Sequence, residues 1–223
     1  MKRWLSLILA AALAVCVFAA CSKDDNTSGS AGKHHVEIEV QDYGTIAVEL
    51  DGDAAPITVE NFLKLAKDGF YDGLTFHRVV EDFIMQGGDP NGDGTGGPGY
   101  TIDGEFSDNG FKKNDIKMET GVIAMARFSD TGSDTEKAYN SAGSQFFILM
   151  ADKDSLQGQY AAFGKVFSGM NILTKLSQCD VDSNDKPRKD IVIESIRVET
   201  YGVDYGEPKT TPKDDYGSAV ETE

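Results

Sequence analysis

Apolar and polar residues alternate with a period of two in several short stretches of this chain. The segments "HVEIEV" (35–40) and "TIAVEL" (45–50) show this alternation, and "QDYG" (41–44) between them is rich in turn-forming residues. This pattern predicts two half-buried strands joined as a β-hairpin. Further short apolar runs follow, separated by turns rich in glycine and aspartate, and the last alternating stretch is "DIVIESIRVET" (190–200).

Two segments instead show the spacing of a helix. In the first, apolar residues recur three and four positions apart, at Val59, Phe62, Leu63 and Ala66. Thr58 is placed to cap this helix and Gly69 to end it. "MNILTKLSQ" (170–178) predicts a second short helix. Many short strands with two helices, in no regular alternation, favour an antiparallel barrel or sandwich.

The N-terminal region has the pattern of an export signal. Lys2 and Arg3 precede an apolar run at 4–20, which ends in small residues before Cys21. We predict a lipoprotein signal peptide at 1–20 and lipidation of Cys21, because "FAAC" (18–21) resembles a lipoprotein box. An ordinary cleaved signal with an incidental cysteine is the alternative. The prediction implies an extracytoplasmic, membrane-anchored protein, at the cell surface or on the periplasmic face.

The regions that flank the folded part are polar. "SKDDNTSGSAGK" (22–33) has no apolar period, so we predict a flexible tether over 21–33 and a folded domain over 34–201. From residue 202 the chain is polar and acidic, which predicts a disordered tail over 202–223. The net charge of −16 argues against a nucleic-acid partner. We expect a monomer.

Several motifs suggest chemistry that their context does not support. "GDGTGG" (92–97) matches a dinucleotide-binding fingerprint, but no strand precedes it and no helix follows. The same region mimics a calcium loop, yet Tyr100 stands where the bidentate glutamate belongs. Three histidines and a solitary Cys179 in the domain make a poor zinc set. We therefore expect no metal and no cofactor, and a reaction that needs neither.

Five motifs, in this order, resemble those of the cyclophilins, a class of peptidyl-prolyl cis-trans isomerases. The motifs are "FHRVVEDFIMQGGD" (76–89), "GTGG" (94–97), "GVIAMA" (121–126), "GSQFFI" (143–148) and "FGKV" (163–166). The resemblance covers roughly residues 35–200. It implies a mainly β fold, namely a closed eight-stranded antiparallel β-barrel capped by two α-helices, and it implies an isomerase that uses no cofactor.

The resemblance also gives a role to Arg78, a charge in an otherwise apolar segment. A twisted X–Pro bond loses amide resonance, and its nitrogen regains a lone pair that can accept a hydrogen bond. A permanently charged donor aimed at that nitrogen stabilises the transition state more than the ground state. The resemblance implies that Arg78 is this donor. The alternative is a structural ion pair with one of the many acidic residues.

The remaining site residues also follow from the resemblance. Gln86 is expected to bond the substrate backbone and to orient Arg78, and Phe83 and Phe147 complete the catalytic set. The proline pocket is expected to consist of Phe83, Ile84, Phe147 and Leu156. The residues expected to line the groove for the residues before the proline, or to pack beside it, are Gly94, Ala126, Arg127, Phe128, Gln145 and Tyr160. At Arg127 we expect the contact to be made by the backbone.

Three departures from the cyclophilin pattern affect these expectations. Ser155 replaces a tryptophan of cyclosporin-sensitive members, so we expect weak or no cyclosporin binding. Tyr160 stands where many members have histidine. The connection at 127–142 is longer than usual, and is either a tolerated surface insertion or a specificity loop. The predicted function is isomerisation of X–Pro bonds in exported proteins, which assists their folding. The alternative is a membrane-tethered chaperone or module that binds proline-containing peptides without catalysis.

Overall fold

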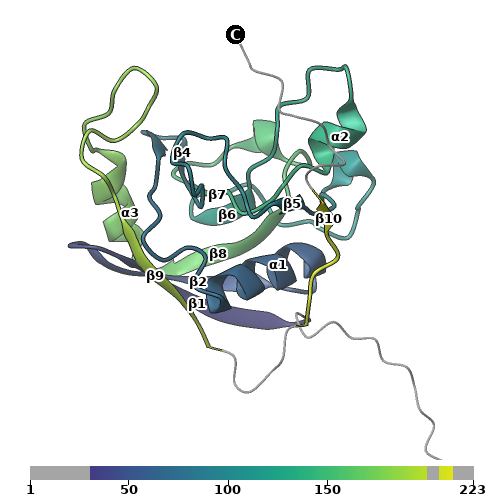
Figure 1. Cartoon of the computed structure of the whole chain (residues 1–223), viewed down its shortest axis with the longest axis horizontal. Coiled ribbons are helices and arrows are strands. Elements are labelled where there is room, and N and C mark those ends of the chain that lie inside the picture. Colours follow the sequence, from purple (N-terminus) through teal and green to yellow (C-terminus); the bar gives the residue numbers. More distant parts are fainter. Residues whose placement is uncertain (1–30, 200–205, 213–223) are drawn as a thin grey trace, which may run out of the picture.

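An eight-stranded antiparallel sheet forms the body of the protein in the computed structural model, which describes residues 31–199 and 206–212 (Figure 1). The order of strands across the sheet is β3-β4-β7-β6-β8-β2-β1-β9. These strands are β1 (Lys33–Val40), β2 (Gly44–Asp51), β3 (Arg78–Val80), β4 (Ile84–Gly87), β6 (Val122–Met125), β7 (Phe146–Leu149), β8 (Ala162–Ser168) and β9 (Ile193–Val198).

The predicted hairpin of β1 and β2 is confirmed. Val36 pairs with Val48 and Ile38 with Ile46 across the two strands. Because successive strand residues point to opposite faces, these four side chains lie on the same face. All four are fully buried, whereas the residues between them in β1 are exposed. The alternation in the sequence thus correctly predicted which face of each strand is buried in the core.

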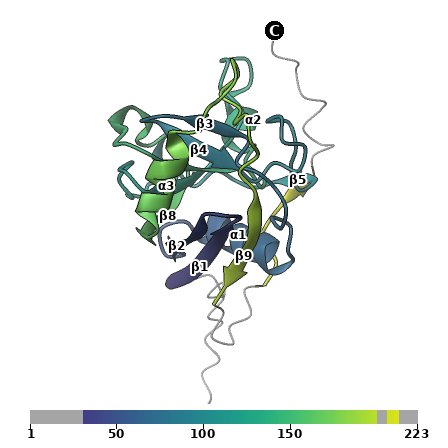
Figure 2. The same ribbon diagram turned by 90° about the vertical axis from the view of Figure 1, so that its left-hand side faces the viewer.

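The sheet curls strongly, and its two edge strands approach each other (Figure 2). The link is made by the segment before β3: Gly73 N–H donates to Ile193 O at 2.8 Å, and Phe76 N–H donates to Ile191 O at 2.9 Å. β3 itself forms no ladder with β9. The expected eight-stranded antiparallel β-barrel is therefore confirmed in strand number and direction, but its closure is incomplete, because β3 and β9 are not paired.

Both predicted helices are present, as α1 (Pro56–Lys67) and α3 (Met170–Ser177). They lie on different sides of the curl (Figures 1 and 2). A third helix, α2 (Thr135–Tyr139), lies in the long connection, and two short 3-10 turns are η1 (Ser107–Asn109) and η2 (Asp154–Leu156).

The expected cap of α1 is wrong. The helix begins at Pro56, a residue suited to a first helical position, so Thr58 lies inside the first turn. A carboxylate distant in sequence takes the capping role. Glu105 accepts the N–H of Ile57 at 3.0 Å, and the N–H and hydroxyl of Thr58 at 2.8 and 2.7 Å. Burial raises the pKa of the Glu105 carboxyl, although these donors oppose the shift.

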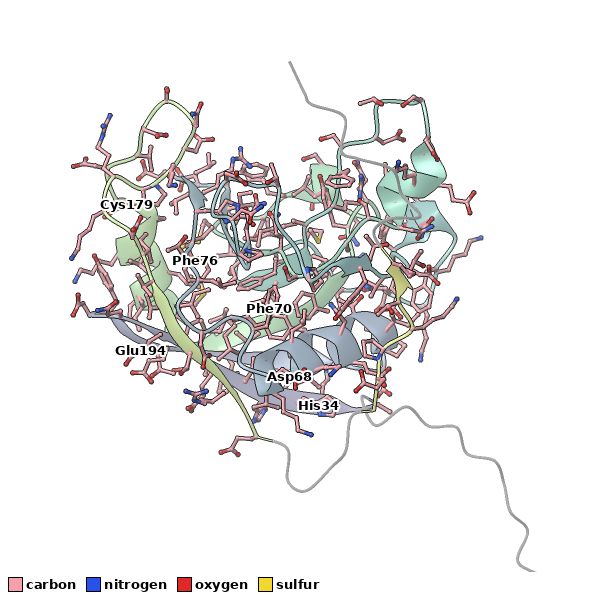
Figure 3. All side chains as sticks on the ribbon, viewed as in Figure 1. His34, Asp68, Phe70, Phe76, Cys179 and Glu194 are labelled. Atoms are coloured by element: carbon pink, nitrogen blue, oxygen red, sulfur yellow. The ribbon has the colours of Figure 1, made fainter. Side chains whose placement is uncertain are left out.

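The main core lies inside the curl and is rich in aromatic rings. Phe62 of α1 packs against Phe146 and Phe163, with ring centroids 5.5 and 5.2 Å apart. Phe76, labelled in Figure 3, is 1 % exposed in the same cluster. Cys179, at the end of α3, packs against this core as a half-buried free thiol, and burial raises its pKa.

Part of the predicted disordered tail is ordered. β10 (Thr211–Pro212) pairs with β5 (Tyr100–Thr101) in a second, two-stranded sheet. Glu207 forms an ion pair with Lys64 of α1 at 3.2 Å, and Pro208 is buried. For residues 206–212 the prediction of disorder is wrong, because backbone pairing and burial hold this segment against the domain.

Other predictions fall outside the described residues. The signal at 1–20, Cys21, most of the tether and residues 213–223 are among them. Within residues 31–199 and 206–212, no helix combines the length and apolarity required to cross a membrane.

Candidate functional site

The strand register places three predicted site residues and one neighbouring residue in a row across the sheet. Arg78 on β3 lies opposite Gln86 on β4, and Gln86 lies opposite Phe147 on β7. Phe147 in turn lies opposite Ala124 on β6. Residues directly opposite each other in an antiparallel sheet share a face. The row from Arg78 to Ala124 therefore lies on the outer face of the curl, away from the main core.

A second apolar cluster covers this outer face. Ile84, Phe147, Val122, Ala124 and their neighbours are buried there, and the partly exposed members at its rim include Phe83, Ala126, Leu156 and Tyr160. The rings of Phe147 and Tyr160 meet edge to face, with centroids 5.4 Å apart. The structure thus brings together all the residues expected to form the proline pocket. This outer cluster is hydrophobic and remains accessible at its rim.

A cavity of about 110 Å³ lies next to this cluster and continues it as a groove. Its lining includes five of the six residues expected in or beside the groove by resemblance, namely Gly94, Ala126, Arg127, Phe128 and Gln145, together with Gln86. The sixth, Tyr160, lies at the rim of the outer cluster. The Nε2 of Gln145 donates to the carbonyls of Gly94 and Gly96, both at 2.9 Å, and its Oε1 accepts from Gln86 Nε2 at 2.9 Å. This relay fixes the amide plane of Gln86 and leaves its Oε1 without a protein donor among the described residues.

Arg78 is held by a residue that sequence reasoning missed. Its Nε and Nη2 donate to Oδ2 of Asp185 at 3.3 and 3.2 Å. Gln86 faces Arg78 across the strand pair, but no hydrogen bond joins their side chains, so the expectation that Gln86 orients Arg78 is not met in this structure. The structural ion pair considered as the alternative does exist. Both side chains are about 40 % exposed, however, and such pairs add roughly 0–1 kcal/mol to stability.

A second cavity, of about 240 Å³, is lined by both Arg78 and Gln86. Charged residues contribute to its lining, among them Asp93, Asp182 and Lys186. His77 also lines it, is 6 % exposed, and has no hydrogen-bond partner at either ring nitrogen. Burial lowers the pKa of His77, which favours a neutral imidazole. Gln86 therefore lines both cavities, whereas Arg78 lines only the second.

The side chain of Arg127 does more than the expected backbone contact. Its guanidinium lies over the rings of Tyr139 and Tyr160, 4.8 and 4.7 Å from their centroids. It also donates to the carbonyls of Gln159 and Phe128 at 2.9 and 2.7 Å. Because Tyr139 belongs to α2, these contacts tie the long connection at 127–142 to the wall of the outer cluster. No group of three or more His, Cys, Asp or Glu side chains in the described part of the chain is arranged to hold a metal ion.

Comparison with known proteins decides the family. The model of the family described as cyclophilin type peptidyl-prolyl cis-trans isomerase/CLD matches residues 35–198. The chain belongs to this family. This cyclophilin is a peptidyl-prolyl cis-trans isomerase.

The relatives and solved structures are consistent with the fold. Peptidyl-prolyl cis-trans isomerase B of Bacillus subtilis is 46 % identical over 142 residues, covering 64 % of this chain and 90 % of the relative. A peptidyl-prolyl cis-trans isomerase of Helicobacter pylori is 44 % identical over 140 residues, covering 62 % and 77 %. The crystal structure of a Cryptosporidium parvum cyclophilin-type isomerase aligns with a TM-score of 0.65 at 32 % identity, covering 75 % of this chain and 98 % of that one.

Proposed function

We propose that this cyclophilin catalyses X–Pro rotation in exported polypeptides, from a lipid anchor at Cys21, and so assists their folding. The carrying observation is the order of segments: a signal-like run at 1–20, Cys21 after small residues, and a polar tether before the domain. Rotation about an amide breaks no bond and consumes no cofactor, so it needs no ATP on the outer side of a membrane. The proposed partners are the membrane, through the lipid, and proline-containing segments of the exported proteins.

The proposed chemistry rests on Arg78. The barrier to X–Pro rotation is roughly 18–20 kcal/mol, and most of it is lost resonance. A hydrogen bond to the pyramidal proline nitrogen forms only in the twisted state, so it lowers the barrier without tightening ground-state binding. Asp185 occupies Nε and Nη2 of Arg78, and the Nη1 group has no protein acceptor among the described residues. This group is our candidate donor.

The roles of the other site residues are assigned from their positions in the outer cluster and in the groove. The proline ring is assigned to the rim of the outer cluster, against Phe83, Phe147 and Leu156. The free Oε1 of Gln86 suits a backbone N–H of the substrate, because Gln145 holds its amide plane. Residues before the proline are assigned to the groove lined by Ala126 and Phe128.

Cyclosporin is proposed to bind weakly or not at all. Ser155 is exposed at η2, beside Leu156 of the pocket rim. Its hydroxymethyl group offers neither the large apolar wall nor the N–H donor of an indole. The protein is proposed to act as a monomer.

Catalysis is tested with the soluble domain, residues 22–223, and the variant Arg78→Ala. A proline peptide assay should show a loss of kcat/KM of about 100- to 1000-fold, the range seen when one transition-state donor is removed. Arg197→Ala is the matched control, because it removes the same charge from an exposed pair on β9. Wild-type binding of proline peptides without acceleration would support the alternative of a non-catalytic binding module.

The anchor is tested with the full chain in a bacterial host that processes lipoproteins. Wild type should take up labelled fatty acid and sediment with membranes, while Cys21→Ser should lose both properties. Cys16→Ser and Cys179→Ser are the controls and should behave as wild type. Label retained by the Cys21→Ser protein would disprove the anchor and leave the assignment of the isomerase untouched.

A further inference from the structure

The loop at 182–187, between α3 and β9, is folded by its own contacts. The carboxylate of Asp182 accepts the N–H groups of Asn184 and Lys186 at 2.8 and 3.1 Å, and Asp182 N–H donates to Lys186 O at 2.9 Å. A bridge between Val181 and Pro187 closes its base. In Figure 1 the loop projects beyond the end of α3. Its conformation therefore does not depend on the ion pair with Arg78.

One residue of this loop contacts β3 twice. Asp185 accepts the N–H of Val79 with its carbonyl at 2.8 Å, and its carboxylate accepts from Arg78. Its φ of 62° lies in the left-handed region. That region is uncommon for residues other than glycine, although aspartate and asparagine adopt it more readily than most. Lys186 adds a hydrogen bond from its Nζ to Gly92 O at 3.2 Å, and both residues line the second cavity.

Stability alone gives no reason for this ion pair. Side chains as exposed as Arg78 and Asp185 contribute little by pairing. The loop is also docked already by the backbone bond to Val79. What the ion pair does change is the conformational freedom of the Arg78 side chain. A free arginine side chain populates many rotamers, and two hydrogen bonds to one carboxylate oxygen remove much of that freedom.

We infer that Asp185 is a positioning residue, which holds the guanidinium of Arg78 ready for the proline nitrogen and makes the 182–187 loop part of the catalytic apparatus. This inference rests on the proposed role of Arg78. It assigns Asp185 no contact with the substrate. The carboxylate acts in the folded enzyme before substrate arrives, so its removal should slow the rotation step rather than weaken peptide binding.

The test compares Asp185→Asn, Asp185→Gly and Asp190→Asn by kcat and KM. Asparagine keeps the shape and tolerates the left-handed backbone, while glycine removes the side chain and keeps the loop conformation accessible. Both should lower kcat roughly three- to tenfold with KM unchanged, because Arg78 regains rotamer freedom. Asp190→Asn makes the same charge change in an exposed residue with no contact to Arg78, and should match wild type.

Salt and a double variant separate positioning from other effects. Added salt should bring wild-type kcat toward that of Asp185→Asn, which should itself respond little. In the Arg78→Ala background, Asp185→Asn should cause no further loss. If Arg78→Ala is inactive but Asp185→Asn shows an unchanged kcat, a raised kcat or a change confined to KM, the inference is overturned. An active Arg78→Ala protein would instead overturn the catalytic role of Arg78.

Discussion

Phe146 and Phe147 are neighbours on β7, yet they belong to opposite faces of the curled sheet. Phe146 is fully buried in the main core, where α1 covers it through Phe62. Phe147 is 4 % exposed in the outer cluster, where Tyr160 and other partly exposed residues form an open rim. Two apolar clusters built from the same strands thus differ in what covers them. A hydrophobic face becomes a binding site when its covering is incomplete.

The largest expected effects come from truncating these two rings. Phe146→Ala should lower the free energy of unfolding by about 3–5 kcal/mol, because it leaves a cavity that neighbouring groups cannot fill. Phe147→Ala should lower it by less, since water can enter from the open rim, while isomerase activity is lost in the folded protein. Urea denaturation measures the first difference and a peptide assay the second. Equal destabilisation by both, with activity of the folded Phe147→Ala protein intact, would mean that the outer cluster is only a second core.

A smaller effect is expected at the cap of the helix that covers the inner face. Burial raises the pKa of Glu105, so the folded protein binds its proton more tightly than the unfolded chain. Its contribution to stability is therefore full below the ordinary value of 4.5 and is lost as pH rises through the raised pKa. Relative to Glu105→Gln, wild type should be more stable by roughly 1–3 kcal/mol near pH 4, and this advantage should shrink toward pH 7.

The Glu105 experiment also sharpens the contrast between the faces. Denaturation curves at intervals of pH give the stability difference, and the peptide assay gives the activity of each folded protein. Glu105→Gln should retain isomerase activity, because Glu105 supports α1 rather than the outer face. An advantage of wild type that grows with pH would contradict the raised pKa.

The smallest effect is expected from the C-terminal segment, which contacts both the helix that covers the main core and a strand beside the groove. Glu207 reaches α1 through Lys64, and β10 pairs with β5, whose Tyr100 lines the groove. Ending the chain at residue 205 should lower the free energy of unfolding by about 1 kcal/mol or less, because the ion pairs are exposed. Ending it at 212 should leave the free energy of unfolding unchanged, and both shortened proteins should keep full isomerase activity. Loss of activity on ending at 212 would give residues 213–223 a role in the site.

The sequence by itself determined the local elements of this protein and predicted which residues its candidate site would contain. The alternation at 35–50 predicted a hairpin, and helical spacing predicted α1 and α3, because each pattern reports which side of one element meets the core. Ordered motifs predicted that Arg78, Gln86 and Phe147 belong together. The strand register then placed these three side by side on one face.

Only the tertiary structure decided which distant residues support those elements. Glu105 caps α1 from 47 residues away, and Asp185 holds Arg78 from 107 residues away. The chain has 37 acidic residues, so no local pattern singles out these two. The same holds for the pairing of β10 with β5 and for the link between the sheet edges. Such contacts depend on how separate elements pack, and a local pattern carries information only about the element in which it lies.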